Sequence, residues 1–77
     1  MLTTYPADEF YRRAHAGEFT NSTVTVRDGS RKILASGRFS GIVLKLTVSR
    51  PHECVPFYRF GSGSEYRFDS DQLVEVE

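Results

Sequence analysis

Residues 39–49 read FSGIVLKLTVS, which is the longest regular stretch of this sequence. Apolar residues occupy the even positions 42 to 48, and most of the odd positions between them are polar. This period of two predicts a β-strand. Gly37 and Gly41 predict a bulge or bend at its start, because glycine inside a strand commonly marks one. The stretch therefore predicts a long, strongly bent strand in the middle of a sheet.

Shorter strands are expected on both sides of this stretch. Residues 23–26 alternate between threonine and valine and lead into an Asp28-Gly29 turn, which is typical of a hairpin. Residues 73–76 supply a final short strand. Pro51 and Pro56 are expected to bracket a loop, because proline has no N–H to donate to a neighbouring strand.

A second hairpin is predicted where the sequence repeats Tyr-Arg-Phe on both sides of residues 61–64. If residues 61–63 form the loop, Arg59 faces Glu65. If the loop is two residues longer, Arg59 faces Arg67, and like charges directly opposite each other are unfavourable. The charges therefore predict the shorter, glycine-containing loop.

The first 17 residues carry the signals of one helix. Pro6 suits the first helical position, and Asp8 and Glu9 would lie in the first turn, where the helix dipole favours negative charge. Gly17 is placed to end the helix. We expect a helix over residues 1–17.

These elements predict an α+β fold in a single domain, residues 1–77. The helix (1–17) would pack on a strongly bent antiparallel sheet (22–77) of about five strands, or on a small barrel, since closure removes exposed strand edges. A chain of 77 residues has room for one domain. Disulfides within the monomer are excluded, because Cys54 is the only cysteine.

The chain resembles the Sm-like and SH3-like small β-barrels at the level of fold. The resemblance rests on the leading helix, the strand and turn over residues 24–29, the bent middle strand and the final strand at 73–76. Residues 69–72 read DSDQ where Sm-like proteins carry a short Arg-Gly segment. The resemblance therefore implies a barrel fold but not the RNA site of that family.

Charge is sorted along the chain although the net charge is zero. Residues 27–50 contain six basic residues and one acidic residue, whereas residues 51–77 contain two arginines and six acidic residues. The two parts either neutralise each other in the fold or present opposite faces to a partner. The basic part makes nucleic-acid binding an alternative function, although dedicated nucleic-acid domains usually carry a clear basic excess. The residues of this alternative site are Arg27, Arg31, Lys32 and Arg38.

Protein binding is the function that the sequence favours. Phe57 is expected on the outer face of its strand, with the Arg67 guanidinium over its ring, and exposed aromatic and arginine side chains are typical of interface hot spots. The equal alternative is that the aromatic residues belong to a core that is closed on both faces. A homodimer, formed through an open sheet edge or the aromatic face, is a further option. The predicted partner-binding residues are Phe57, Arg59, Arg67, Asp69 and Asp71.

The candidates for chemistry are few. His52, Glu53 and Cys54 combine a thiol with an imidazole, but nucleophilic catalysis needs the imidazole to reach the sulfur and a pocket around both. A zinc site usually has four ligands, and the chain has one cysteine and two histidines. Residues 61–64 precede a strand rather than a helix, so they predict a turn and not a phosphate loop. We expect no metal and no cofactor, and a Cys54-dependent enzyme is the third alternative.

No apolar run reaches membrane-spanning length, and the first residues lack the layout of a signal peptide. We therefore expect a cytoplasmic protein without a membrane partner. The sequence as a whole predicts a small non-enzymatic protein-binding module that acts as an adaptor, regulator or inhibitor of a protein partner.

Overall fold

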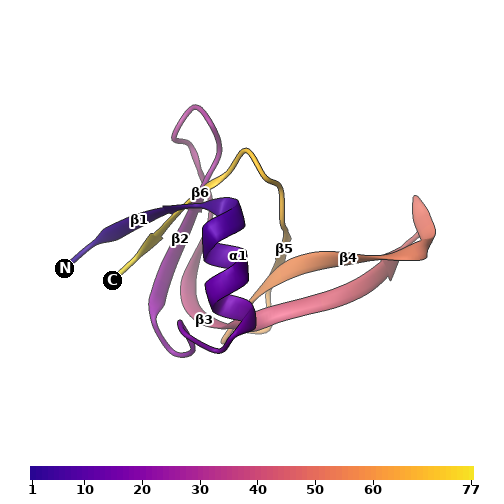
Figure 1. Ribbon diagram of the computed structural model, residues 1–77, viewed down its shortest axis with the longest axis horizontal. Helices are drawn as coiled ribbons and strands as arrows, with labels where there is room; N and C mark the ends of the chain where they lie inside the picture. Colours follow the sequence, from indigo (N-terminus) through magenta and orange to yellow (C-terminus); the bar gives the residue numbers. More distant parts are fainter.

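The computed structural model describes all 77 residues as a curved antiparallel sheet with one helix on one face (Figure 1). The strand order is β1-β6-β2-β3-β4-β5, so β1 and β5 are the two edges of an open sheet. In chain order the elements are β1 (Thr3–Pro6), α1 (Ala7–His15), β2 (Thr23–Arg27), β3 (Ile33–Thr47), β4 (Arg50–Phe60), β5 (Glu65–Arg67) and β6 (Leu73–Val76).

The prediction of an α+β fold is wrong. Strands hold 55% of the residues and the helix holds 12%, so the chain is mainly β. The sheet has six strands rather than about five, and it is open rather than closed into a barrel. The barrel does not form because β1 and β5 lie at opposite ends of the strand order and do not pair with each other.

The missed strand lies at the N-terminus, inside the range predicted as helix. Thr3–Pro6 pair with β6, and Tyr5 lies opposite Val74. Pro6 has an extended backbone (φ −59°, ψ 148°), and the helix therefore begins one residue later, at Ala7. Its end agrees with the glycine signal, since Gly17 adopts φ +87° and its N–H donates to the carbonyl of Ala14.

β3 belongs to two halves of the sheet and bends between them. It pairs with β2 up to Arg38 and with β4 from Phe39 onward. The register shifts between Phe39 and Gly41, which marks a β-bulge, and both Gly37 and Gly41 adopt φ +153°. Only glycine enters this backbone region readily, so the predicted bend at these two glycines is confirmed.

The core lies between α1 and the concave side of the sheet. Phe10 of α1 is completely buried and stacks on Phe19, with ring centroids 4.8 Å apart. It also contacts Phe39 of β3 and Tyr58 of β4, at centroid distances of 5.1 and 5.8 Å. Four valines of β2 and β6 complete the floor of this core: Val24, Val26, Val74 and Val76.

The second hairpin has the predicted register. Arg59 lies opposite Glu65, and Tyr58 lies opposite Tyr66. The N–H of Phe60 donates to the carbonyl of Ser64, and Gly63 adopts φ +92° in the loop. The three-residue loop that the charges favoured is therefore confirmed.

β3 and β4 continue past the rest of the sheet as a two-stranded projection (Figure 1), and we call residues 44–56 the arm. The prediction of a loop between Pro51 and Pro56 is wrong, because both prolines lie in β4. The carbonyl of Pro56 accepts a hydrogen bond from the N–H of Phe68, so Pro56 directs its backbone polar atoms away from β3. Its missing N–H therefore interrupts no hydrogen bond to β3.

Candidate protein-binding face

Phe57, Arg59, Glu65 and Arg67 lie together on the convex side of the sheet, and we call these four residues the β4–β5 face. The register places Phe57 opposite Arg67 and Arg59 opposite Glu65. Residues opposite each other in a sheet share a side, and alternate residues along one strand do too. Tyr58, between Phe57 and Arg59, consequently points the other way, into the core.

The carboxylate of Glu65 pairs with two cations, Arg59 of this face and Lys45 of the neighbouring strand β3. Glu65 accepts a hydrogen bond from the Lys45 ammonium at 2.6 Å, and its second oxygen lies 3.5 Å from Arg59. The hydrogen bond from Lys45 is the main reason why the pKa of Glu65 falls below its ordinary value, and the charges of Lys45 and Arg59 add to it. The Lys45 ammonium lies 5.3 Å from the centre of the Phe57 ring. The cation over this ring is therefore Lys45, and not Arg67 as the sequence pattern predicted.

The two predicted acidic residues lie beside the β4–β5 face. Arg67 and Asp69 both line an open hollow of about 370 Å³ along the edge of β4. The same two residues line a second hollow, of about 420 Å³, where Asp71 joins them. Phe57 and Arg59 line neither hollow. The five predicted residues therefore form a cationic, aromatic face with an acidic border, rather than one pocket.

A buried amide, which the sequence analysis missed, holds this border in place. The side-chain oxygen of Gln72 accepts hydrogen bonds from the Tyr58 hydroxyl and the Asp69 N–H, both at 2.9 Å. Its side-chain nitrogen donates to the carbonyl of Arg67 at 3.2 Å. Because a buried polar group without a partner is costly, this amide fixes the turn that carries Arg67 and Asp69. Glutamine is usually exposed, so nothing in the sequence indicated this buried role.

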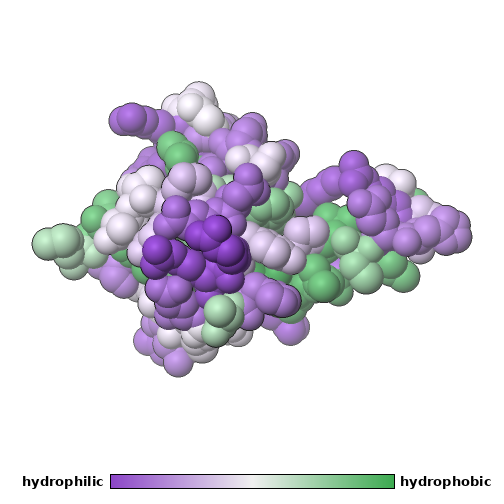
Figure 2. Space-filling view, viewed as in Figure 1, coloured by the Kyte–Doolittle hydropathy of each residue, from purple (hydrophilic) through white to green (hydrophobic).

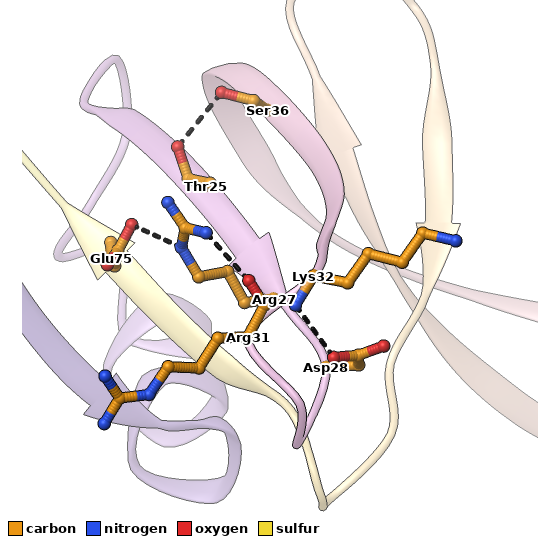
Figure 3. A network of polar contacts seen from close by, with 7 residues as sticks. All are labelled: Thr25, Arg27, Asp28, Arg31, Lys32, Ser36 and Glu75. Atoms are coloured by element: carbon orange, nitrogen blue, oxygen red, sulfur yellow. Dashed lines mark hydrogen bonds and ion pairs between the residues drawn. The ribbon is translucent and has the colours of Figure 1, made fainter.

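The basic residues predicted for nucleic acid do not form one patch. Arg27 is tied to Glu75 at 2.9 Å and to the carbonyl of Arg31 at 2.8 Å (Figure 3). The side chains of Arg31 and Lys32 extend in opposite directions from the turn (Figure 3). Arg38 pairs with Thr23 at the far end of the β2–β3 hairpin, roughly 20 Å from that turn at about 3.3 Å per residue.

The turn between β2 and β3 is built around Asp28. One oxygen of its carboxylate accepts hydrogen bonds from the N–H and hydroxyl of Ser30 and from the N–H of Lys32. These bonds, the Ser30 hydroxyl first, hold the pKa of Asp28 below its ordinary value. An open hollow of about 520 Å³ lies beside this turn, with Arg27 and Arg31 in its wall.

His52, Glu53 and Cys54 lie in β4 on the exposed arm rather than in a loop. Glu53 pairs with Arg50 at 3.5 Å. The structure holds no group of three or more histidine, cysteine and carboxylate side chains that could bind a metal ion. Its single helix, at nine residues, is too short to cross a membrane.

Comparisons with protein-family models, with curated proteins and with solved structures found no match to this chain. The resemblance to Sm-like and SH3-like proteins therefore stays a prediction.

Proposed function

We propose that this chain is a small non-enzymatic protein-binding module that acts as an adaptor, regulator or inhibitor of a protein partner. The observation that carries the proposal is the β4–β5 face, where Phe57 lies beside Lys45 and opposite Arg67. Aromatic and arginine side chains on a rigid support contribute most of the binding energy in many protein interfaces.

The charge of this face indicates the kind of partner. The carboxylate of Glu65 pairs with Lys45 and Arg59. Arg67, opposite Phe57, adds a further cation, so this part of the surface keeps an excess of positive charge. Asp69 and Asp71 border it with negative charge. A partner with acidic groups around an apolar contact for Phe57 would match this arrangement, since complementary charges give specificity and fast association.

The test is a matched pair of charge reversals. A tagged chain is used to capture proteins from a lysate of its source cells, and captured proteins are quantified by mass spectrometry. We expect the variant R59E/R67E to lose at least about nine-tenths of the captured partner, because removing hot-spot residues costs about 2 kcal/mol or more. The variant R31E/K32E changes the charge equally on another part of the surface, and we expect it to keep the partner.

Two further results decide the outcome. The thermal midpoint of R31E/K32E should stay within a few degrees of the wild type, because exposed substitutions change stability by about 0.5 kcal/mol or less. The midpoint of R59E/R67E should fall by several degrees, because the first substitution places a carboxylate opposite Glu65, and circular dichroism should show that this variant stays folded at the capture temperature. Equal capture by the wild type and R59E/R67E would contradict the proposed face.

Nucleic-acid binding is the second candidate, and the observation that favours it is the pair Arg31 and Lys32, which are exposed and form no ion pair. Fluorescence polarisation with random oligonucleotides at low and at physiological salt tests it. Binding that weakens steeply with salt and disappears in R31E/K32E would support this candidate. Binding that also disappears in R59E/R67E, or no binding at low salt, would contradict a site at Arg31 and Lys32.

The catalytic alternative depends on Cys54. Its thiol is exposed on the arm, without an enclosed pocket around it, which favours a role without catalysis. If Cys54 reacts no faster than free cysteine with a mild alkylating agent at neutral pH, the catalytic alternative is excluded.

An exposed free thiol is typical of reducing compartments, and we therefore assign the module to the cytoplasm.

A further inference from the structure

The outer edge of β5 has backbone groups without a neighbouring strand. β5 is the last strand of the sheet and pairs only with β4. The N–H of Phe68 donates to the carbonyl of Pro56, and hydrogen-bonded pairs alternate with non-bonded pairs along an antiparallel ladder. Arg67 and Glu65, which precede Phe68 at odd spacings, therefore direct their N–H and C=O groups away from β4.

Three of these four groups are open to a ligand. The carbonyl of Arg67 already accepts a hydrogen bond from the side chain of Gln72 at 3.2 Å. The N–H of Arg67 and both groups of Glu65 remain, and an added extended strand is the element that satisfies such groups. A hydrophobic band also runs along the arm (Figure 2), but many kinds of apolar surface fit such a band, whereas a strand edge selects an extended backbone.

An open hollow beside this edge gives an added strand room. All three residues of β5 line the hollow of about 420 Å³, and Leu34 of β3 lines it too. Leu34 and Tyr66 are partly buried against the core. Because side chains alternate along a strand, every second side chain of an added strand would have an apolar contact here. The opposite edge of the sheet is less suited, since β1 ends at Pro6, which has no N–H to donate.

The charges around the hollow indicate the composition of the strand. Asp28, Asp69 and Asp71 line it, with Arg67 as the only cation. Asp69 and Asp71 belong to none of the ion pairs of the chain. Hydrogen bonds hold the pKa of Asp28 below its ordinary value, so its carboxylate stays negative at neutral pH. The fourth carboxylate, Glu65, is already paired with two cations. A strand with basic side chains therefore matches the hollow.

We propose that the edge of β5 binds an extended, basic peptide segment of a partner protein as an additional strand of the sheet. The backbone of this segment would pair with Glu65 and Arg67, and its basic side chains would pair with Asp69 and Asp71. The acidic border of the β4–β5 face is thereby assigned a ligand of its own. β5 has only three residues, so we expect weak binding, with a dissociation constant on the order of 100 μM for a short peptide.

Amide NMR titration with synthetic peptides tests this proposal. The probe is the peptide KVKVK, acetylated and amidated at its ends, whose valines suit the apolar contact and whose lysines suit the carboxylates. We expect the amide signals of Glu65 and Arg67 to shift and their hydrogen exchange to slow, because both N–H groups gain a hydrogen bond. The acidic peptide EVEVE should bind at least about tenfold more weakly.

Two N-methylated forms of the basic probe separate strand addition from simple charge attraction. The methyl group is placed on the backbone nitrogen of the second or of the third residue, which changes neither the charge nor the side chains. Since successive N–H groups of a strand point to opposite edges, one form should bind at least about fivefold more weakly and the other should bind like the parent peptide.

A pair of charge-neutralising variants tests the acidic lining. D69N/D71N should weaken the binding of KVKVK at least about threefold, because two exposed ion pairs are lost. E18Q/E53Q removes the same number of charges from exposed residues outside the hollow and should leave the dissociation constant unchanged. Circular dichroism checks the fold of both variants.

An absence of shifts at about 2 mM peptide, shifts that lie away from residues 64–72, equal binding of KVKVK and EVEVE, or equal binding of both N-methylated forms would each overturn the proposal. The result is independent of the β4–β5 face. At a temperature where it is folded, R59E/R67E should lose the partner of that face but keep the basic probe, because it leaves the backbone of β5 in place and removes a cation from the hollow.

Discussion

The body of the sheet, by which we mean the sheet outside residues 44–56, shares the strands β3 and β4 with the arm, but α1 lies over the body alone. Phe39 of β3 lies under Phe10 of α1 and is buried, whereas Leu44 and Leu46, a few residues further along, are more than half exposed. The difference shows that an apolar strand face is buried only where another element lies over it, and in this chain α1 reaches only the body.

The first prediction measures that difference directly. Replacing Phe10 with alanine should lower the free energy of unfolding by about 3–5 kcal/mol, because it leaves a cavity between Phe19, Phe39 and Tyr58. Replacing Leu46 with alanine should change it by about 0.5 kcal/mol or less, since that side chain is exposed. Urea unfolding monitored by circular dichroism at micromolar protein gives both values. Equal losses would mean that the arm packs as part of the body.

The second prediction concerns the bend between body and arm. Gly41→Ala should lower the free energy of unfolding by about 1–3 kcal/mol, because φ at this position is +153°, a region unfavourable for alanine. A Cβ at Gly41 would meet no atom within 4 Å, so the loss would come from the backbone alone. Ser40→Ala, one residue earlier, is the matched control and should stay within about 0.5 kcal/mol. Thermal and urea unfolding compare the two, and a harmless Gly41→Ala would contradict a strained bend.

Where the sequence carried a local physical constraint, it predicted the structure. The opposite charges of Arg59 and Glu65 selected the hairpin register, and the glycines at 37 and 41 marked the bend. β1 was missed because Thr3–Pro6 contain little apolar pattern and become a strand only by pairing with β6. Closure into a barrel had no local signal either, since it depends on whether the two edges of the sheet meet.

The candidate site was predicted in part for the same reason. Strand alternation was enough to place Phe57, Arg59 and Arg67 on one face. It could not identify Lys45 as the cation over Phe57, because β3 and β4 had not been assigned as partners along the arm. The prolines of β4 were interpreted as the ends of a loop, and the arm itself therefore went unrecognised.

The third prediction concerns the pH dependence of stability that comes from the buried Tyr58 of β4. Burial is the main cause of the raised pKa of its hydroxyl, and the charges of Asp69 and Asp8 add to it. Because the folded state binds this proton more tightly than the unfolded state does, the contribution of Tyr58 to stability should be constant below about pH 10. Above it, stability should fall by up to about 1.4 kcal/mol per pH unit. Urea unfolding between pH 8 and 11 measures this slope.

Two variants assign the slope to one side chain. Tyr58→Phe should remove it, at a cost of about 1 kcal/mol at neutral pH, because Gln72 loses one donor but keeps the Asp69 N–H. Tyr66→Phe, opposite Tyr58 in β5, should keep the slope. An unchanged slope in Tyr58→Phe would place the titrating group elsewhere.

The last prediction concerns the ion pair between Lys45 of the arm and Glu65 of the body, and it has the smallest expected effect. The pKa of Glu65 lies below its ordinary value of 4.5, chiefly because of the hydrogen bond from Lys45. The pair therefore contributes stability above that value, and the contribution is lost as the pH falls and the carboxylate takes up a proton.

Lys45→Met should bring the pKa of Glu65 back toward 4.5, as measured by NMR titration of the carboxyl carbon, whereas Arg59→Met should change it less because Arg59 is the weaker contributor. If the two variants act equally, the arm is held by its backbone alone. If Lys45→Met acts more strongly and also speeds amide exchange in residues 44–56, this ion pair holds the arm against the body, and the position of Lys45 over Phe57 depends on it. The cation of the β4–β5 face would then come from the arm, so that one ion pair couples the position of the arm to the composition of the proposed binding face.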